Sequence, residues 1–188
     1  MKSQLSKNNS SQNPLSMPLD EDLDLTEIIN GEITMGPSPF GKHQNISGNL
    51  YYVIRQYIEK YKLGRLYYSP LDVILEEGIN RLQPDLLFIK KDNVNIDQDW
   101  IRGVPDMVCE IVSTGSVVKD TITKKDIYER YKVQEYWIVI PELKTIEVLC
   151  LDGDKYKLFS IAEGTGFIQS KIIEGLCIDI NDIFDNIY

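Results

Sequence analysis

One acidic residue, Glu110, lies in the middle of an apolar run that is predicted to form a buried strand. The run is MVCEIVS, residues Met107–Ser113, and the alternation of a strand places Glu110 on the same face as Val108 and Val112. A carboxylate in such a place is costly unless it is paired or coordinates a metal. Glu110 is therefore either half of a buried ion pair with a lysine or arginine, or a metal ligand or catalytic group, since perturbed carboxylates concentrate in functional sites.

A second carboxylate is needed if the site binds a divalent cation. Asp106 shares a strand face with Glu110, but four residues of strand span about 13 Å, which is too far for both to touch one ion. Asp85 opens the apolar run Leu86–Ile89, which can pair with the strand of Glu110 at the usual separation of about 4.8 Å. Asp85 and Glu110 are thus predicted to converge on one cation. The alternative for Asp85 is an ordinary Pro-Asp turn.

Two lysines, Lys124 and Lys125, begin the helix that is predicted after the strand of Glu110. A strand–helix–strand crossover folds that helix back over the sheet, so its first turn can approach the end of the preceding strand. A lysine there could orient a water molecule or stabilise a phosphate anion; the alternative is a solvated helix end. Adjacent helical side chains diverge by about 100°, so only one can face the carboxylates. Lys124 shares the face of Ile127 and Tyr128 and is the predicted one.

The chain contains a single histidine, His43, at the start of a predicted helix. Such a residue is either a capping or surface side chain or an accessory group of the site. The three cysteines, Cys109, Cys150 and Cys177, form no C-x-x-C pair, which argues against a structural zinc site. Each lies in an apolar run and is expected to be buried and reduced. The sequence has no phosphate-binding glycine loop, dinucleotide fingerprint, serine nucleophile elbow or HExxH motif.

The length and net charge of the chain limit the number of domains and the classes of function that it can have. The 188 residues fit one domain, expected at 20–188 after a disordered tail at 1–19 that is rich in Ser, Asn, Gln and Pro. The formal net charge of −9 argues against a protein that coats nucleic acid by bulk charge, but not against a nuclease that meets phosphate through a metal ion. No signal peptide or membrane span is expected, so the predicted location is cytoplasmic and no membrane partner is predicted.

The elements that must position these residues follow from hydrophobic periodicity. Apolar residues at helical spacing predict a helix over Phe40–Lys62, with Gly64 as its stop, and a second helix over Lys124–Val133. The acidic segment Asp20–Glu27 is interpreted as a solvated turn or short helix start. Strands are predicted at Gly31–Gly36, Arg65–Ser69, Leu71–Glu76, Leu86–Ile89, Met107–Ser113 and Glu135–Ile140, followed by a hairpin at Thr145–Ser160 and a short strand and helical turn within Gly175–Phe184. This order predicts an α/β (α+β) fold with a mixed sheet and helices packed on it.

Several blocks of the sequence resemble one known family. They are PDLLFIKK, GVPDMVCEIVSTGS and KDTITKKDIYERYKVQEYWIVIP, with GEITMGPSPFGKHQNISGNL and LDVILEEGINRLQPD before them and GLCIDINDIF after them. In this order they resemble the large bacterial family of restriction-endonuclease-like proteins that is abundant in cyanobacteria and belongs to the PD-(D/E)XK nuclease superfamily. The resemblance covers residues 30 to 185. It implies a mixed central β-sheet flanked by helices, in agreement with the periodicity.

The superfamily motif consists of an aspartate, an acidic residue one strand later and a lysine. Asp85 and Glu110 match the two acidic positions, but the usual lysine position holds Val112. The resemblance places the lysine on the following helix, at Lys124, with Lys125 as the fallback.

The resemblance also implies an activity and a set of ligands. The activity is hydrolysis of DNA phosphodiester bonds by a Mg²⁺-dependent endonuclease, with Mn²⁺ as an alternative ion. Asp85, Glu110 and the backbone carbonyl of Ile111 would bind the metal, and Gln83 and His43 are accessory candidates because they lie in family blocks.

Other readings of the same sequence remain. The chain could be a catalytically silent member that keeps the fold for DNA or protein binding, or a different phosphodiester or nucleotide hydrolase. A homodimer is compatible with cutting both DNA strands, which needs two sites.

Overall fold

The computed structural model describes residues 25–36, 40–113 and 115–185, so the tail predicted at 1–19 lies outside it. A six-stranded sheet of order β11-β10-β9-β8-β6-β3 forms the centre of this part of the chain. β8 and β9 run parallel and the other neighbouring strands run antiparallel, so the predicted mixed sheet is confirmed. The strands are β3 (Gly64–Tyr68), β6 (Leu86–Lys90), β8 (Met107–Ile111), β9 (Glu135–Ile140), β10 (Thr145–Asp152) and β11 (Lys155–Glu163).

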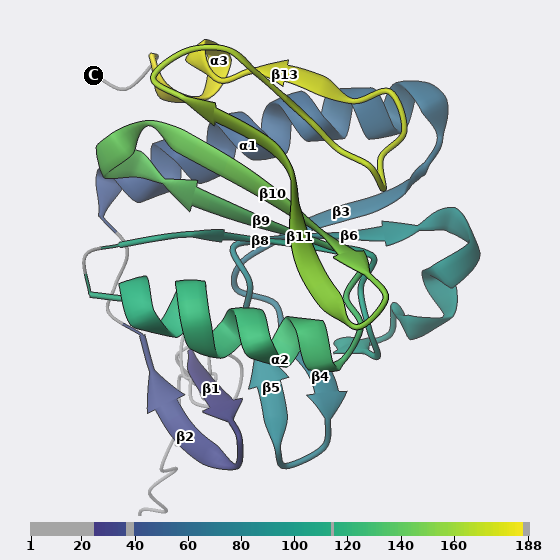
Figure 1. The fold of residues 1–188 in the computed structure, drawn as a ribbon. Coiled ribbons are helices and arrows are strands. Elements are labelled where there is room, and N and C mark those ends of the chain that lie inside the picture. The colour runs from purple at the N-terminus through teal and green to yellow at the C-terminus, as the bar shows by residue number, and fades with distance from the viewer. Residues whose placement is uncertain (1–24, 37–39, 114, 186–188) are drawn as a thin grey trace, which may run out of the picture.

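The two faces of this sheet are covered differently (Figure 1). Helices α1 (Gly41–Tyr61) and α3 (Asn181–Phe184) lie on one face, with the small β12 (Phe167–Gln169) and β13 (Cys177–Asp179) sheet. On the other face lie α2 (Lys125–Arg130) and a second sheet of order β2-β1-β5-β4-β7. The strands of the second sheet are β1 (Thr26–Ile29), β2 (Glu32–Met35), β4 (Val73–Glu76), β5 (Asn80–Leu82) and β7 (Ile101–Arg102); the short helices are η1 (Lys91–Ile96), η2 (Lys119–Lys124) and η3 (Pro141–Leu143). In the described part of the chain, no helix is long and apolar enough to cross a membrane.

Strand alternation divides the core into two clusters. In β8, Met107, Cys109 and Ile111 pack into the cluster that contains the buried stripe of α1, which is Ile46, Leu50, Ile54 and Ile58. Val108 and Val112 belong to the cluster on the opposite face, with Ile127 and Tyr128 from α2. Glu110 shares the face of Val108 and Val112, so its side chain is directed to the side that α2 covers.

The end of α1 differs from the prediction. The helix ends at Tyr61, and the left-handed residue that caps it is Lys62, with φ of 54°, not Gly64. Gly64 lies in β3, where an added Cβ would come 2.0 Å from the carbonyl oxygen of Ile89. Glycine is therefore required there by the close approach of β3 and β6, and not by a helix cap.

Two further expectations were wrong. Glu27 does not belong to a solvated turn or helix start, because Thr26–Ile29 forms β1, which pairs with β2 and β5 and buries Glu27 and Ile29. Cys177 is exposed at the start of β13, whereas Cys109 and Cys150 are buried as expected. The apolar neighbours of Cys177 alternate across a small surface sheet, so only every second residue turns inward.

Candidate active site

Asp85 lies directly before β6, beside the end of β8. The antiparallel pairing of β6 and β8 sets Leu86 opposite Cys109, and one further step along each strand sets Asp85 opposite Glu110. The Oδ2 atom of Asp85 accepts a hydrogen bond of 2.7 Å from the backbone N–H of Ile111. Asp85 is therefore fixed beside the end of β8, at the residue that follows Glu110.

Glu110 is buried in a polar network, with 3% of its surface exposed. Its Oε1 atom accepts hydrogen bonds from the ammonium of Lys124 at 2.9 Å and from the hydroxyl of Tyr128 at 2.8 Å. Burial raises the pKa of Glu110, and the charge of Lys124 opposes that rise. Burial and the charge of Glu110 also raise the pKa of Tyr128, so the hydroxyl keeps its proton and remains a donor. Among the described residues, Oε2 of Glu110 receives no hydrogen bond.

Lys124 is the lysine that faces the carboxylates. Its side chain is also 3% exposed, and its ammonium makes a second ion pair of 2.8 Å with Oε1 of Glu27. Burial alone would lower the pKa of Lys124, but the charges of Glu110 and Glu27 prevail and raise it, so Lys124 stays cationic at neutral pH. Lys125 is partly exposed and lies near Glu129, on the other side of the helix.

An unusual helical turn joins β8 to α2. Residues Lys119–Lys124 form a π-helix, in which hydrogen bonds run from i to i+5. In an α-helix, residues five apart diverge by about 140°, whereas the wider π turn lets Lys119 and Lys124 approach the same partner. Lys119 pairs with Oε2 of Glu27 at 2.9 Å, and Lys124 pairs with Oε1.

Sequence reasoning missed Glu27, Lys119 and Asp120 as members of this network. Asp120 is 3% exposed; burial raises its pKa, and the charge of Lys124 opposes the rise. The signal in the sequence was the five-residue spacing of Lys119 and Lys124. In an α-helix this spacing does not place two side chains on the same face.

The structure places His43 against the candidate metal ligand. Its Nε2 atom lies 3.2 Å from Oδ1 of Asp85, and its buried Nδ1 atom has no hydrogen-bond partner among the described residues. Burial would lower the pKa of His43, but the hydrogen bond to Asp85 and the charge of Asp85 raise it, with a contribution from the backbone of Ile111. His43 caps no helix end, since the N-cap of α1 is Phe40.

Gln83 supports the site from the preceding segment. Its backbone N–H donates a hydrogen bond of 2.9 Å to Oε1 of Glu27, and its side-chain amide donates one of 2.8 Å to Oδ1 of Asp72. Gln83 therefore links the segment before β6 to β1, the strand that contains Glu27.

Asp106 lies at the other end of β8 from Glu110. Its Oδ2 atom accepts hydrogen bonds from the backbone N–H of Lys90 and from the side-chain amide of Asn93. As the strand length predicts, Asp106 is directed elsewhere and stabilises the loop after β6.

Glu27 should contribute strongly to stability, in a pH-dependent way. Burial would raise its pKa, but the charge of Lys124 and the bonds from Gln83 and Lys119 hold the pKa below the ordinary value of 4.5. The stabilisation is therefore complete above pH 4.5 and is lost as the pH falls through the lower folded-state pKa. We expect Glu27→Gln to reduce the free energy of unfolding by about 1–3 kcal/mol at neutral pH. Urea titrations should show this difference narrowing in acid; a constant difference would contradict the pairing.

The mixed sheet with two acidic residues on adjacent strands and a buried lysine defines the class of protein: a fold like that of restriction endonucleases. The structure matches the crystal structure of "a putative nuclease belonging to DUF820" from Anabaena variabilis, with a TM-score of 0.70 and 20% identity over 85% of this chain and 89% of that chain. At this identity the likeness shows the fold. The model of the Uma2 family, described as "Putative restriction endonuclease", matches residues 12–181, so the chain belongs to that family. No curated protein matches. Membership supports a nuclease function in general.

Proposed function

We propose that the protein is a divalent-metal-dependent DNA endonuclease that hydrolyses phosphodiester bonds. The observation that carries the proposal is the buried Glu110–Lys124–Glu27 network beside Asp85 on the neighbouring strand. Burying three ionisable groups around one strand end is costly for a purely structural purpose, because apolar packing would serve stability as well. Such clusters are typical of sites that handle charged substrates.

The oxygen atoms at the site suit Mg²⁺ or Mn²⁺, which favour carboxylate and carbonyl ligands. In the described residues no group of three or more His, Cys, Asp or Glu side chains is arranged to hold a metal. A cation would therefore rely on Asp85 and Glu110, completed by the carbonyl of Ile111. Oδ1 of Asp85 already holds one polar group, the ring of His43, at 3.2 Å. When bound, the cation polarises the scissile phosphate and lowers the pKa of an attacking water.

The residues of this chain have distinct roles around that cation. Lys124 and Tyr128 both hold Oε1 of Glu110, which fixes the carboxylate plane and leaves Oε2 for the metal. Because its pKa is raised, Lys124 cannot serve as the general base. It instead offsets negative charge that develops on the phosphate, or orients the water. Asp85 would exchange its contact with His43 for one with the cation.

The substrate part of the proposal is DNA, and cleavage of both strands requires two such sites. A homodimer would supply them.

Nicking of supercoiled plasmid tests the proposed function. We expect the wild-type chain to convert supercoiled DNA to nicked and linear forms with Mg²⁺ or Mn²⁺ and not in EDTA. Asp85→Asn should abolish the conversion, whereas the matched control Asp106→Asn should retain it, since Asp106 only caps a loop. Cleavage that persists in EDTA, or that survives Asp85→Asn, would contradict the assignment; a chain that cleaves nothing under any metal would be a silent member of the family.

A further inference from the structure

Within the part of the chain that the structure describes, most basic side chains are neutralised by an acidic neighbour, and a smaller set is not. Ion pairs to carboxylates involve Lys42, Arg55, Arg65, Arg81, Arg102, Lys119, Lys124, Lys132, Lys144, Lys155 and Lys157. Within the described ranges, the lysines without a carboxylate partner are Lys60, Lys62, Lys90, Lys91, Lys125 and Lys171. Five of these six lysines lie on segments that meet at one edge of the molecule, whereas Lys125 and Arg130, which bonds Asn30, lie on α2.

The meeting point is an open cavity of about 650 Å³. Lys90 and Lys91 reach it from the end of β6, and Lys171 reaches it from the loop after β12. The floor is apolar, formed by Leu63, Phe88 and Ile172, and the acidic lining residues are Asp92 and Glu174. The backbone N–H of Lys91 donates to the carbonyl of Leu63 at 3.0 Å, which ties the cavity to the end of α1. Lys60 and Lys62 lie just before Leu63 and add to the positive charge.

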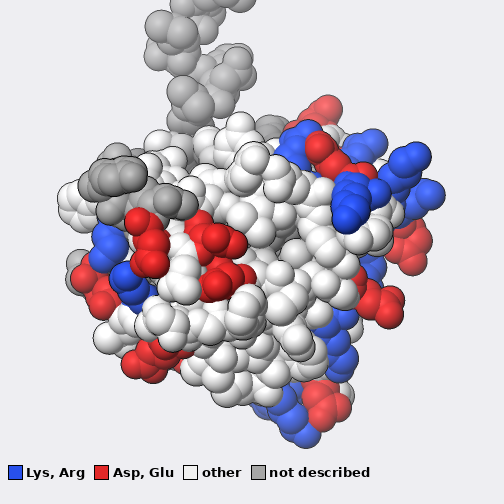
Figure 2. All heavy atoms as spheres, turned by 90° about the horizontal axis from the view of Figure 1, so that it is seen from above, with Lys and Arg blue, Asp and Glu red and all other residues white. Residues whose placement is uncertain are grey.

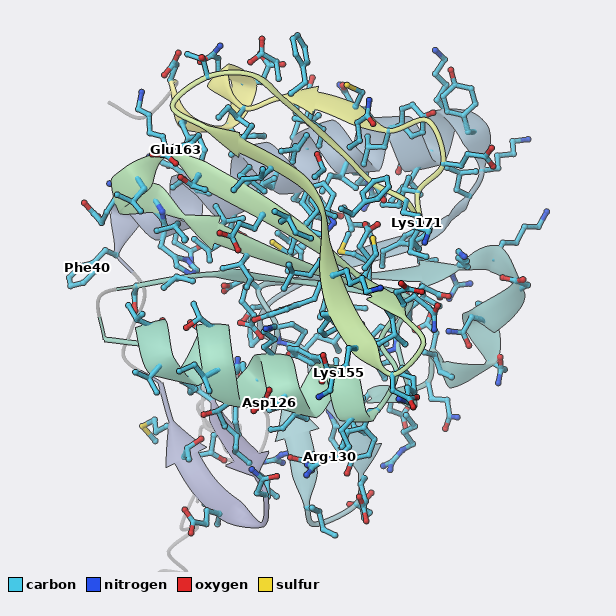
Figure 3. The ribbon with its side chains drawn as sticks, viewed as in Figure 1. Phe40, Asp126, Arg130, Lys155, Glu163 and Lys171 are labelled. Carbon is cyan, nitrogen blue, oxygen red and sulfur yellow. The ribbon has the colours of Figure 1, made fainter. Side chains whose placement is uncertain are left out.

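This cavity is remote from the candidate active site. Asp85 and Lys90 stand at opposite ends of β6, and five residues of strand span about 16 Å. In Figure 3 Lys171 lies on the opposite side of the molecule from Phe40, the residue that precedes α1 and the turn of His43. Figure 2 keeps the same left and right, and shows Lys and Arg mainly on the side of Lys171, with Asp and Glu between them. The basic residues around the cavity therefore form a separate surface.

Unpaired ammonium groups held close together repel one another, and a polyanion relieves that repulsion while releasing its own counterions. Away from a metal site, a chain with a net charge of −9 holds an acidic polymer where such local positive charge opposes the average. We propose that Lys90, Lys91 and Lys171 form an exosite that binds the phosphate backbone of nucleic acid. The inference rests on the proposed function and adds to it the second point at which the substrate is held.

The separation fits a flanking DNA segment. About 16 Å corresponds to about five base pairs of B-form DNA, at 3.4 Å for each pair. The exosite would hold backbone a few nucleotides from the scissile bond. It contributes affinity but no base readout, since phosphate contacts fix position and do not read sequence.

Salt-dependent DNA binding tests the exosite without any cleavage. The protein is the full chain carrying Asp85→Asn, in EDTA, and the probe is a short fluorescein-labelled duplex followed by anisotropy over a series of KCl concentrations. The test variant adds Lys90→Gln, Lys91→Gln and Lys171→Gln. The matched control adds Lys132→Gln, Lys144→Gln and Lys157→Gln, which removes the same charge from exposed lysines that are already paired.

We expect the test variant to bind at least about tenfold more weakly at low salt, and its plot of log affinity against log salt to flatten by about 0.9 for each lost phosphate contact. The control should match the parent. If DNA affinity falls equally in the test and control variants, the effect comes from bulk charge and the exosite is overturned. The exosite is also overturned if neither variant loses affinity or if the parent does not bind the duplex. Cleavage by the wild-type chain, measured separately with Mg²⁺, reports on the proposed function independently of these outcomes. The same triple substitution in the wild-type background should raise KM for DNA and leave kcat unchanged.

Discussion

Replacement of Glu110 by glutamine is expected to abolish DNA cleavage while changing the free energy of unfolding by no more than about 1 kcal/mol. Glutamine keeps the oxygen that accepts hydrogen bonds from Lys124 and Tyr128. It removes the buried negative charge, which is costly to desolvate, and Lys124 retains Glu27 as its partner. The variant loses only the anionic oxygen that a divalent cation needs.

Plasmid nicking and urea unfolding, measured on the same preparation, separate the two roles of Glu110. A loss of several kcal/mol in Glu110→Gln would mean that the ion pair with Lys124 is chiefly structural. A variant that cleaves at the parent rate would remove Glu110 from the metal site. A useful matched control is Glu135→Gln, a second buried strand carboxylate, whose hydrogen bonds come from Trp137, Ser170 and the backbone of Lys171. That change should reduce stability and leave kcat for the folded fraction unchanged at saturating DNA, because Glu135 holds the backbone of Lys171 and a displaced Lys171 would alter only the affinity for DNA.

Removal of the Lys124 ammonium should reduce the cleavage rate by about 100-fold or more, since a buried cation at the scissile phosphate acts mainly on the transition state. Lys125→Ala should retain nearly the parent rate, because Lys125 is partly exposed and lies beside Glu129. Lys124→Met also leaves Glu110 and Glu27 buried without their cation, which should cost about 3–5 kcal/mol of stability. The rate must therefore be measured where the variant is shown by circular dichroism to be folded.

A double variant separates catalysis by Lys124 from its contribution to stability. Lys124→Met with Glu27→Gln removes one positive and one negative charge together, so much of the lost stability should return. If Lys124 acts on the phosphate, the double variant stays inactive although it is stable. Recovery of cleavage along with stability would show that Lys124 only supports the fold.

Part of the arrangement of the candidate site could be predicted from the sequence through the cost of burying a charged side chain. Glu110 could be singled out because a strand of apolar residues leaves a carboxylate no solvent, and Asp85 because strand spacing excludes Asp106. The facing lysine followed from helical geometry, since adjacent side chains cannot both turn inward. The pairing of β6 with β8 and the contact of Lys124 with Glu110 agree with these arguments.

Other members of the network could not be predicted, for physical reasons. Glu27 lies in an acidic segment, and nothing local shows that a second sheet folds β1 against the π-helix. The π-helix itself depends on tertiary pairing of Lys119 and Lys124 with one carboxylate, which outweighs the preference for an α-helix. Tyr128 was expected only to fill the core, because helical periodicity reports that a side chain is buried and not what its hydroxyl contacts.

The fold could be predicted where the pattern of apolar residues identifies a complete helix or strand. Helical spacing of apolar residues predicts the buried stripe of α1, and a continuous apolar run predicts strand β6. The five-stranded second sheet was only partly visible, because β5 and β7 are three and two residues long and are held by neighbours distant in sequence.

The most direct test of the metal site is a crystal of the protein soaked in Mn²⁺ and examined by anomalous diffraction. We expect one peak at ligand distance from an oxygen of Asp85, from Oε2 of Glu110 and from the carbonyl of Ile111, and no such peak in crystals of Asp85→Asn. An absence of any peak between Asp85 and Glu110 at saturating Mn²⁺, or the two carboxylates directed to opposite faces of the sheet, would contradict the account.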